Sequence, residues 1–171
     1  PDPKERAVAE ASVRDTVRLS AFLHVLARGE GLEAAIADLV RLVPGSTESG
    51  TIRRVAEWMH ANEATRTAGL LGTGLLAHRS GLPQFAWERL TELPDEVWLA
   101  HAVDEYVLLA GEFDRDELVR AVGLLTAAEA SPLPARTWNN VLRRCIGYDL
   151  VEPVPTLLAR LSEAVALAEA S

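Results

Sequence analysis

Residues 66–93 read RTAGLLGTGLLAHRSGLPQFAWERLTEL, which is the pattern of two helices joined at a short turn. The second half places Ala86, Leu90 and Leu93 at helical rather than alternating spacing. Ser80 and Gly81 stand between the halves, and glycine after the last periodic residue is a common helix stop signal. The stretch therefore predicts two adjacent helices packed as an antiparallel hairpin.

The same alternation of apolar helical stripes and stop signals continues along the whole chain, and no convincing strand interrupts it. We expect an all-α protein of about nine helices in antiparallel hairpins, forming a single domain over residues 1–171. The first residue is proline rather than methionine, so we expect a fragment of a larger protein. The expected helices cover 3–28, 32–43, a segment from Thr47 or Ser49 to Met59, the stretch up to Ser80, 82–93, 97–110, 117–130, 137–146 and a last one through Leu157 and Leu167.

Composition supports this fold class and excludes others. Apolar residues make up 49% of the chain and aromatic residues only 5%, a balance that favours helix over strand. No apolar run approaches the roughly 20 residues needed to cross a bilayer, so no membrane partner is expected. The single cysteine, Cys145, excludes an internal disulfide, and we expect it to be a buried apolar side chain in a cytoplasmic, bacterial protein.

The charge is concentrated in one region. Residues 92–130 carry ten acidic and two basic side chains, which accounts for the whole formal net charge of −8. Such a region repels phosphate groups, so we expect no nucleic-acid partner. It is typical either of a solvated helix face or of a surface for a basic partner.

Three glycines, Gly69, Gly72 and Gly74, fall inside one expected helix, where each costs about 1 kcal/mol relative to alanine. Their order does not match a nucleotide-binding loop, and no strand precedes them. We expect them to allow close approach of the backbone of another helix. The alternative is a ligand that contacts the backbone of these glycines directly.

Part of the chain resembles a tetratricopeptide repeat. Gly74 and Ala86 are small residues twelve positions apart on either side of the Gly81 turn, as in that family, and Pro94 stands near its terminating proline. The following units depart from the pattern, with Asp104 and Asp116 in place of the small pair, although Gly111 and Gly147 are expected at their turns. The resemblance implies an α-solenoid with a concave protein-binding surface; an irregular helical bundle is the alternative.

Residues that could carry chemistry are few and scattered. Glu57 with His60, and His101 with Glu105, have helical spacing that a metal could use, but neither pair has the further ligands of a known site. The doublets Arg53-Arg54 and Arg143-Arg144 are expected to be salt-bridged surface groups. No metal, cofactor or catalytic residue is predicted.

We therefore expect a protein-interaction or scaffold module rather than an enzyme. Its partner would be a protein or peptide with a basic surface, bound through the acidic region and exposed aromatic side chains. The residues expected at the contact are Trp98, Asp104, Glu105, Asp116 and Trp138.

Two alternatives remain. One is a helical enzyme, or an accessory domain of one, with a small-molecule pocket near Gly69–Gly74 and acid–base groups in His78 and His101. The other is a DNA-binding regulator that uses residues 51–71 as a helix-turn-helix, against which the acidic balance counts.

Overall fold

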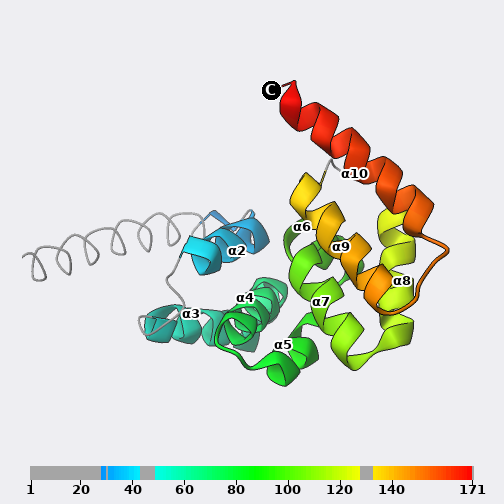
Figure 1. Ribbon diagram of the computed structural model, residues 1–171. Coiled ribbons are helices and arrows are strands. Elements are labelled where there is room, and N and C mark those ends of the chain that lie inside the picture. The colour runs from blue at the N-terminus through cyan, green and yellow to red at the C-terminus, as the bar shows by residue number, and fades with distance from the viewer. Residues whose placement is uncertain (1–27, 30, 43–48, 128–132, 171) are drawn as a thin grey trace, which may run out of the picture.

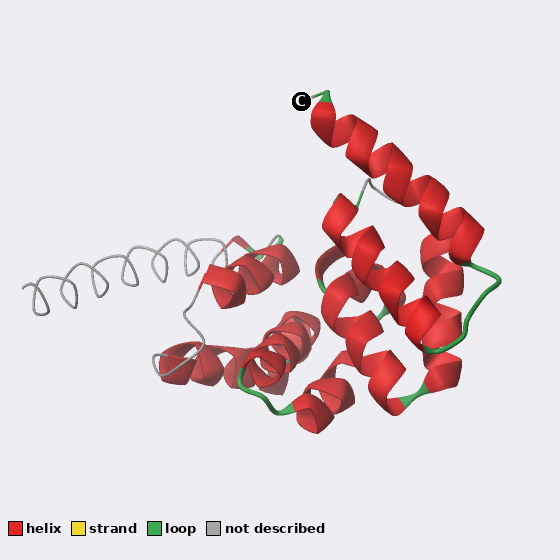
Figure 2. Cartoon of the chain, in the orientation of Figure 1, coloured by secondary structure: helices red, strands yellow, loops and turns green. Residues whose placement is uncertain are grey.

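A computed structural model describes residues 28–29, 31–42, 49–127 and 133–170 (Figure 1). Within these ranges every regular element is helical and no strand occurs (Figure 2), which confirms the predicted all-α class. The expected helix over 3–28 lies outside the described residues except for Arg28. The helices are α2 (Leu32–Leu42), α3 (Ser49–Ala61), α4 (Arg66–Arg79), α5 (Pro83–Leu90), α6 (Asp95–His101), α7 (Val103–Phe113), α8 (Arg115–Ala127), α9 (Ala135–Gly147) and α10 (Val154–Glu169), with a 3-10 turn at Glu63–Thr65.

Helix α4 is the centre of the N-terminal half, because α2, α3 and α5 all pack against it. Its glycines make this possible. A Cβ atom on Gly69 would lie 2.1 Å from the backbone nitrogen of His60 in α3, and one on Gly74 would lie 2.6 Å from Leu90 Cδ2 in α5. A Cβ on Gly72 would meet Ile36 of α2 at 2.7 Å. The expected close approach of another backbone is thus confirmed at Gly69, and the other two glycines make room for side chains.

Helix α7 has the corresponding position in the C-terminal half. It contacts α5, α6, α8 and α9, and α9 in turn packs along α10, which runs antiparallel to it (Figure 1). One continuous apolar core joins the two halves. Its largest fully buried members include Ile36, Met59, Leu71, Leu90, Trp98, Leu109, Leu118, Leu125 and Leu157.

Some of the glycines that were predicted to mark turns do so in the structure, and others do not. Gly81 has a positive φ of 72° after α4, and the amide N–H of Leu82 donates to the Ala77 carbonyl oxygen at 2.9 Å, as in a Schellman cap. Gly111, however, lies inside α7, so the prediction that it marks a turn is wrong. Gly147 is the last residue of α9 and the chain turns directly after it, but Asp149, with φ 55°, takes the left-handed position there.

A second difference concerns the helix expected over 97–110. The chain breaks at Ala102, whose φ of −143° is not helical, so that α6 and α7 are separate elements. The break lets Trp98 fold back and stack on Tyr106, with ring centroids 4.2 Å apart.

Among the described residues, no helix combines the length and apolar character that a membrane span requires.

Candidate binding groove between α4, α7 and α9

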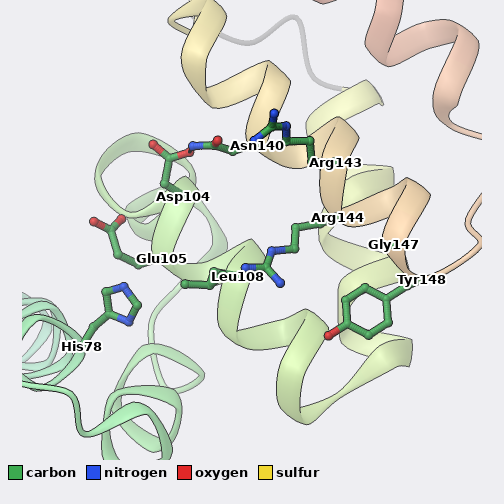
Figure 3. A pocket seen from close by; sticks show the side chains of 9 residues that line it. All are labelled: His78, Asp104, Glu105, Leu108, Asn140, Arg143, Arg144, Gly147 and Tyr148. Carbon is green, nitrogen blue, oxygen red and sulfur yellow. Dashed lines mark hydrogen bonds between the residues drawn. The ribbon is translucent and has the colours of Figure 1, made fainter.

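A cavity of about 530 Å³ opens between α4, α7 and α9 (Figure 3). We call it the α4–α7–α9 groove. Three helices from distant parts of the sequence line it, each with one face. The lining residues are His78 from α4, Asp104, Glu105 and Leu108 from α7, Asn140, Arg143, Arg144 and Gly147 from α9, and Tyr148 just after α9.

Helical periodicity explains why these residues share one space. Glu105 and Leu108 are three positions apart on α7, and Asn140, Arg143, Arg144 and Gly147 follow the i, i+3, i+4, i+7 spacing of a single face of α9. The opposite face of α9 carries Trp138, Val141 and Cys145, which are buried. Burial of this apolar face therefore directs the polar face toward the groove.

The acidic wall comes from α7, and its two carboxylates differ. Asp104 accepts hydrogen bonds from Thr137 Oγ1 and Asn140 Nδ2, both at 3.1 Å, and lies 3.8 Å from the Arg136 guanidinium. This carboxylate therefore ties α9 to α7. Glu105 has no such role: its Oε2 atom is buried and has no hydrogen-bond partner among the described residues. A buried polar atom without a partner carries a desolvation cost of about 1–3 kcal/mol, which a donor from outside could offset.

The basic wall comes from α9. Arg143 is exposed and Arg144 is half-buried, and within the described part of the chain neither side chain makes a salt bridge or a hydrogen bond. In Figure 3 Arg144 reaches from α9 toward Leu108, into the space between the walls. The expectation that this doublet is salt-bridged is therefore wrong for the described residues.

Tyr148 closes one end of the groove. Its ring lies against Gly111 of α7, where a Cβ atom would come within 2.8 Å of the ring carbon Cε2. The backbone carbonyl of Tyr148 also accepts a hydrogen bond from Arg115 Nη2 at 3.1 Å. Glycine is thus required at position 111 by its contact with the Tyr148 ring and not by a turn. The sequence pattern does not show this contact.

The electrostatic consequence is a groove with opposite charges on facing walls that do not neutralise each other by direct contact. No ion pair joins Glu105 to Arg143 or Arg144 among the described residues. Partly buried charges interact more strongly than charges in bulk water, because screening is weaker there. The groove is therefore suited to a ligand that brings a cationic and an anionic group together.

Other carboxylates of the acidic region are already engaged elsewhere. The Arg120 guanidinium contacts Asp95 at 2.8 Å and Glu117 at 2.6 Å, and these hydrogen bonds hold the pKa of both carboxyl groups below their ordinary values. Glu117 also accepts a hydrogen bond from the Tyr106 hydroxyl at 2.6 Å. Burial, followed by this carboxylate, raises the pKa of Tyr106.

The structure brings together two of the five residues expected at a partner contact. Asp104 and Glu105 line the groove, whereas Asp116 is exposed on α8 outside it. Trp98 and Trp138 are 0% and 4% exposed, so the expectation that they are surface aromatics is wrong. Trp98 stacks on Tyr106, and Trp138 belongs to the apolar face of α9 that the core requires.

The histidines singled out from the sequence do not converge. His78 lines the groove, but the described side chains around the groove do not include His101, which is half-buried on α6 and whose carbonyl oxygen accepts a hydrogen bond from Arg41. Across the described ranges, no cluster of three or more His, Cys, Asp or Glu side chains could hold a metal ion. Burial raises the pKa of Cys145, which disfavours its thiolate form.

Sequence reasoning missed Asn140, Arg143 and Arg144 as groove residues. The available signal was their i, i+3, i+4 spacing on one face of a helix whose other face is apolar. Comparison with known proteins adds no assignment to this geometry: no family model, curated protein or solved structure matches the chain.

Proposed function

We propose that this protein is an interaction module that holds a segment of a partner protein in the α4–α7–α9 groove. The observation that carries the proposal is the pair of facing walls. Glu105 on one side and Arg143 and Arg144 on the other have no charged or hydrogen-bonding partner within the described residues. A partner segment with one basic and one acidic side chain would satisfy both walls at once.

The arrangement of the helices supports a stack of helical hairpins as the scaffold of this groove. In this interpretation α4–α5, α7–α8 and α9–α10 are successive hairpins, and their first helices line the groove. The packing of α7 against α5, α8 and α9 is the contact pattern that such a stack requires. A concave face built in this way suits an extended segment, because successive hairpins present side chains to successive positions of the ligand.

The partner that we propose is more specific than one with a basic surface. Glu105 can bind one cationic group of the partner, whereas Asp104 is already hydrogen-bonded to Thr137 and Asn140 of α9. The two arginines would bind an acidic side chain or a C-terminal carboxylate in the same partner segment. We therefore expect ligands of mixed charge to bind more tightly than uniformly basic ones.

A displayed peptide library tests this proposal. Selection on the wild-type protein, with counter-selection on an Arg143→Gln, Arg144→Gln double variant, should enrich peptides that carry both charges. For an enriched peptide we expect Glu105→Gln and each arginine substitution to weaken binding about tenfold, the usual effect of one lost charged hydrogen bond. Asp116→Asn is the matched control, since it removes one negative charge outside the groove.

Two results would contradict the proposal. The first is a selection that enriches the same peptides on the wild-type protein and the double variant. The second is an equal loss of affinity for Glu105→Gln and Asp116→Asn, which would mean that net charge and not the groove governs binding.

A further inference from the structure

A second cavity, of about 400 Å³, lies between α3, α4 and α5 and shares no lining residue with the groove. This volume falls within the range of small-molecule sites, roughly 300–1,000 Å³. We call it the α3–α4–α5 cavity. Its lining residues are Arg53, Glu57 and His60 from α3, Thr73, Leu76 and Ala77 from α4, Leu82, and Phe85 and Arg89 from α5.

Arg89 provides the first argument for a ligand. Its Nη1 atom donates to Glu92 Oε1 at 3.3 Å, but its Nε–H is buried and has no acceptor in the described part of the chain. A guanidinium presents its donors in a fixed planar fork, so a group that accepts from Nε can be held in a defined orientation. The cavity is where such an acceptor could enter.

Helix α3 adds charge to the same space. Arg53, Glu57 and His60 follow the i, i+4, i+7 spacing of one helix face, and within the described residues none of these side chains forms an ion pair or a hydrogen bond. With Arg89 the lining carries two permanent positive charges against the single carboxylate of Glu57. The balance favours an anionic group over a cationic one.

The remaining wall is apolar and open to solvent. Leu82 and Phe85 are 47% and 41% exposed, although both are large apolar side chains. The Arg89 guanidinium lies over the Phe85 ring, 4.8 Å from its centroid. Exposed apolar surface next to an unmet cationic donor is typical of a site for an amphipathic anion.

We propose that the α3–α4–α5 cavity binds a small carboxylate with an apolar or aromatic body. The carboxylate accepts from Arg89 Nε–H and from Arg53, and the apolar body covers Leu82 and Phe85. The side chains of Leu76 and Ala77 close the base of the site, where both are buried. The proposal does not depend on the function assigned to the α4–α7–α9 groove.

The test is a titration of the full chain with 3-phenylpropanoate, followed by amide chemical shifts in two-dimensional NMR. We expect shifts on α3 and α5 and saturable binding, with the neutral 3-phenylpropanamide at least about tenfold weaker because it lacks the charge. Arg53→Gln should weaken the acid several-fold. Arg54→Gln is the matched control, an exposed arginine next in sequence that does not line the cavity.

A second arm identifies the source of the carboxylate. An acetylated dipeptide ending in phenylalanine with a free carboxylate should bind no more tightly than 3-phenylpropanoate if the ligand is a free small molecule. Much tighter binding of the dipeptide would overturn the small-molecule assignment in favour of a protein terminus. Equal binding of acid and amide, equal effects of Arg53→Gln and Arg54→Gln, or no shifts on α3 and α5 would overturn the proposal itself.

Discussion

Gly69→Ala adds one methyl group at the point where α4 lies closest to α3. The new Cβ would lie 2.1 Å from the His60 backbone nitrogen, whereas ordinary van der Waals contact begins at 3.4 Å, so the helices would have to separate by about 1.3 Å. A gap of that size forfeits roughly half of the dispersion attraction across the interface. Overpacked cores typically lose about 1–3 kcal/mol. Because backbone cannot swing aside as a side chain can, we expect about 3 kcal/mol.

Gly123→Ala is the control for this substitution. Gly123 is also inside a helix, but a Cβ there would meet no atom of the described residues within 4 Å. Alanine should therefore stabilise the protein by about 1 kcal/mol through helix propensity alone. Urea unfolding followed by circular dichroism measures both changes. The same pair should differ in melting temperature, by roughly −6 to −12 °C for Gly69→Ala and +2 to +4 °C for Gly123→Ala.

The result that would refute this reasoning is a Gly69→Ala protein within 1 kcal/mol of the wild type. The α3–α4 approach would then be looser than described, and the glycines of α4 would need another explanation.

Three further predictions follow from local geometry and charge. Asp149→Gly should stabilise the protein by about 0.5–1 kcal/mol in urea unfolding, because Asp149 has a φ of 55° that glycine adopts without strain; no gain would argue against the cap. The Arg120 guanidinium lowers the pKa of Asp95 and Glu117 below their ordinary 3.8 and 4.5, so the unfolded chain binds more protons there. The contribution of these two carboxylates to the free energy of unfolding should be fully present above about pH 4.5 and be lost as the pH falls through their pKa values in the folded protein. Arg120→Met should reduce this dependence of stability on pH in acid titrations. An unchanged dependence would exclude the ion pairs as its source. Cys145 is fully buried with a raised pKa, so a thiol reagent should modify it only on unfolding, and rapid labelling of the native protein would contradict its burial.

The sequence was informative where structure depends on neighbours in the chain. Apolar periodicity predicted the succession of helices. The cap of α8 is equally local, since the Glu117 amide N–H donates to Asp114 Oδ1 at 3.0 Å. Gly81 was predicted as a turn residue for the same local reason. Each of these features is decided within one helical turn, so a single sequence contains the necessary information.

Features that depend on distant contacts were not predictable. Nothing near Ala102 signals a helix break, and the stacking of Trp98 on Tyr106 that the break allows is a tertiary contact between two helices. Gly111 was assigned to a turn, but the ring of Tyr148, 37 residues later, lies against it. Both errors follow from assigning a local role to a residue whose surroundings are set by packing.

The candidate site shows the same division. Asp104 and Glu105 were recognised as charged residues of a possible surface, but the arginines opposite them were treated as ordinary surface groups. The groove exists only because α9 packs beside α7. The apolar periodicity of either helix predicts which face is buried but not which helix packs against it. Trp98 and Trp138 were expected at the surface because a sequence shows that an aromatic is present and not which face of the fold covers it.

The hydrogen bonds from Thr137 and Asn140 to Asp104 have a consequence for the thermodynamics of binding. They fix the spacing of α7 and α9 in the free protein, so the width of the groove between them is set before a ligand arrives. Little backbone entropy of the protein then remains to be lost on association, and the ordering cost falls on the entering segment and on the side chains of Arg143 and Arg144. A rigid ligand that already has the bound conformation would gain affinity here, whereas added flexibility in the ligand would reduce it.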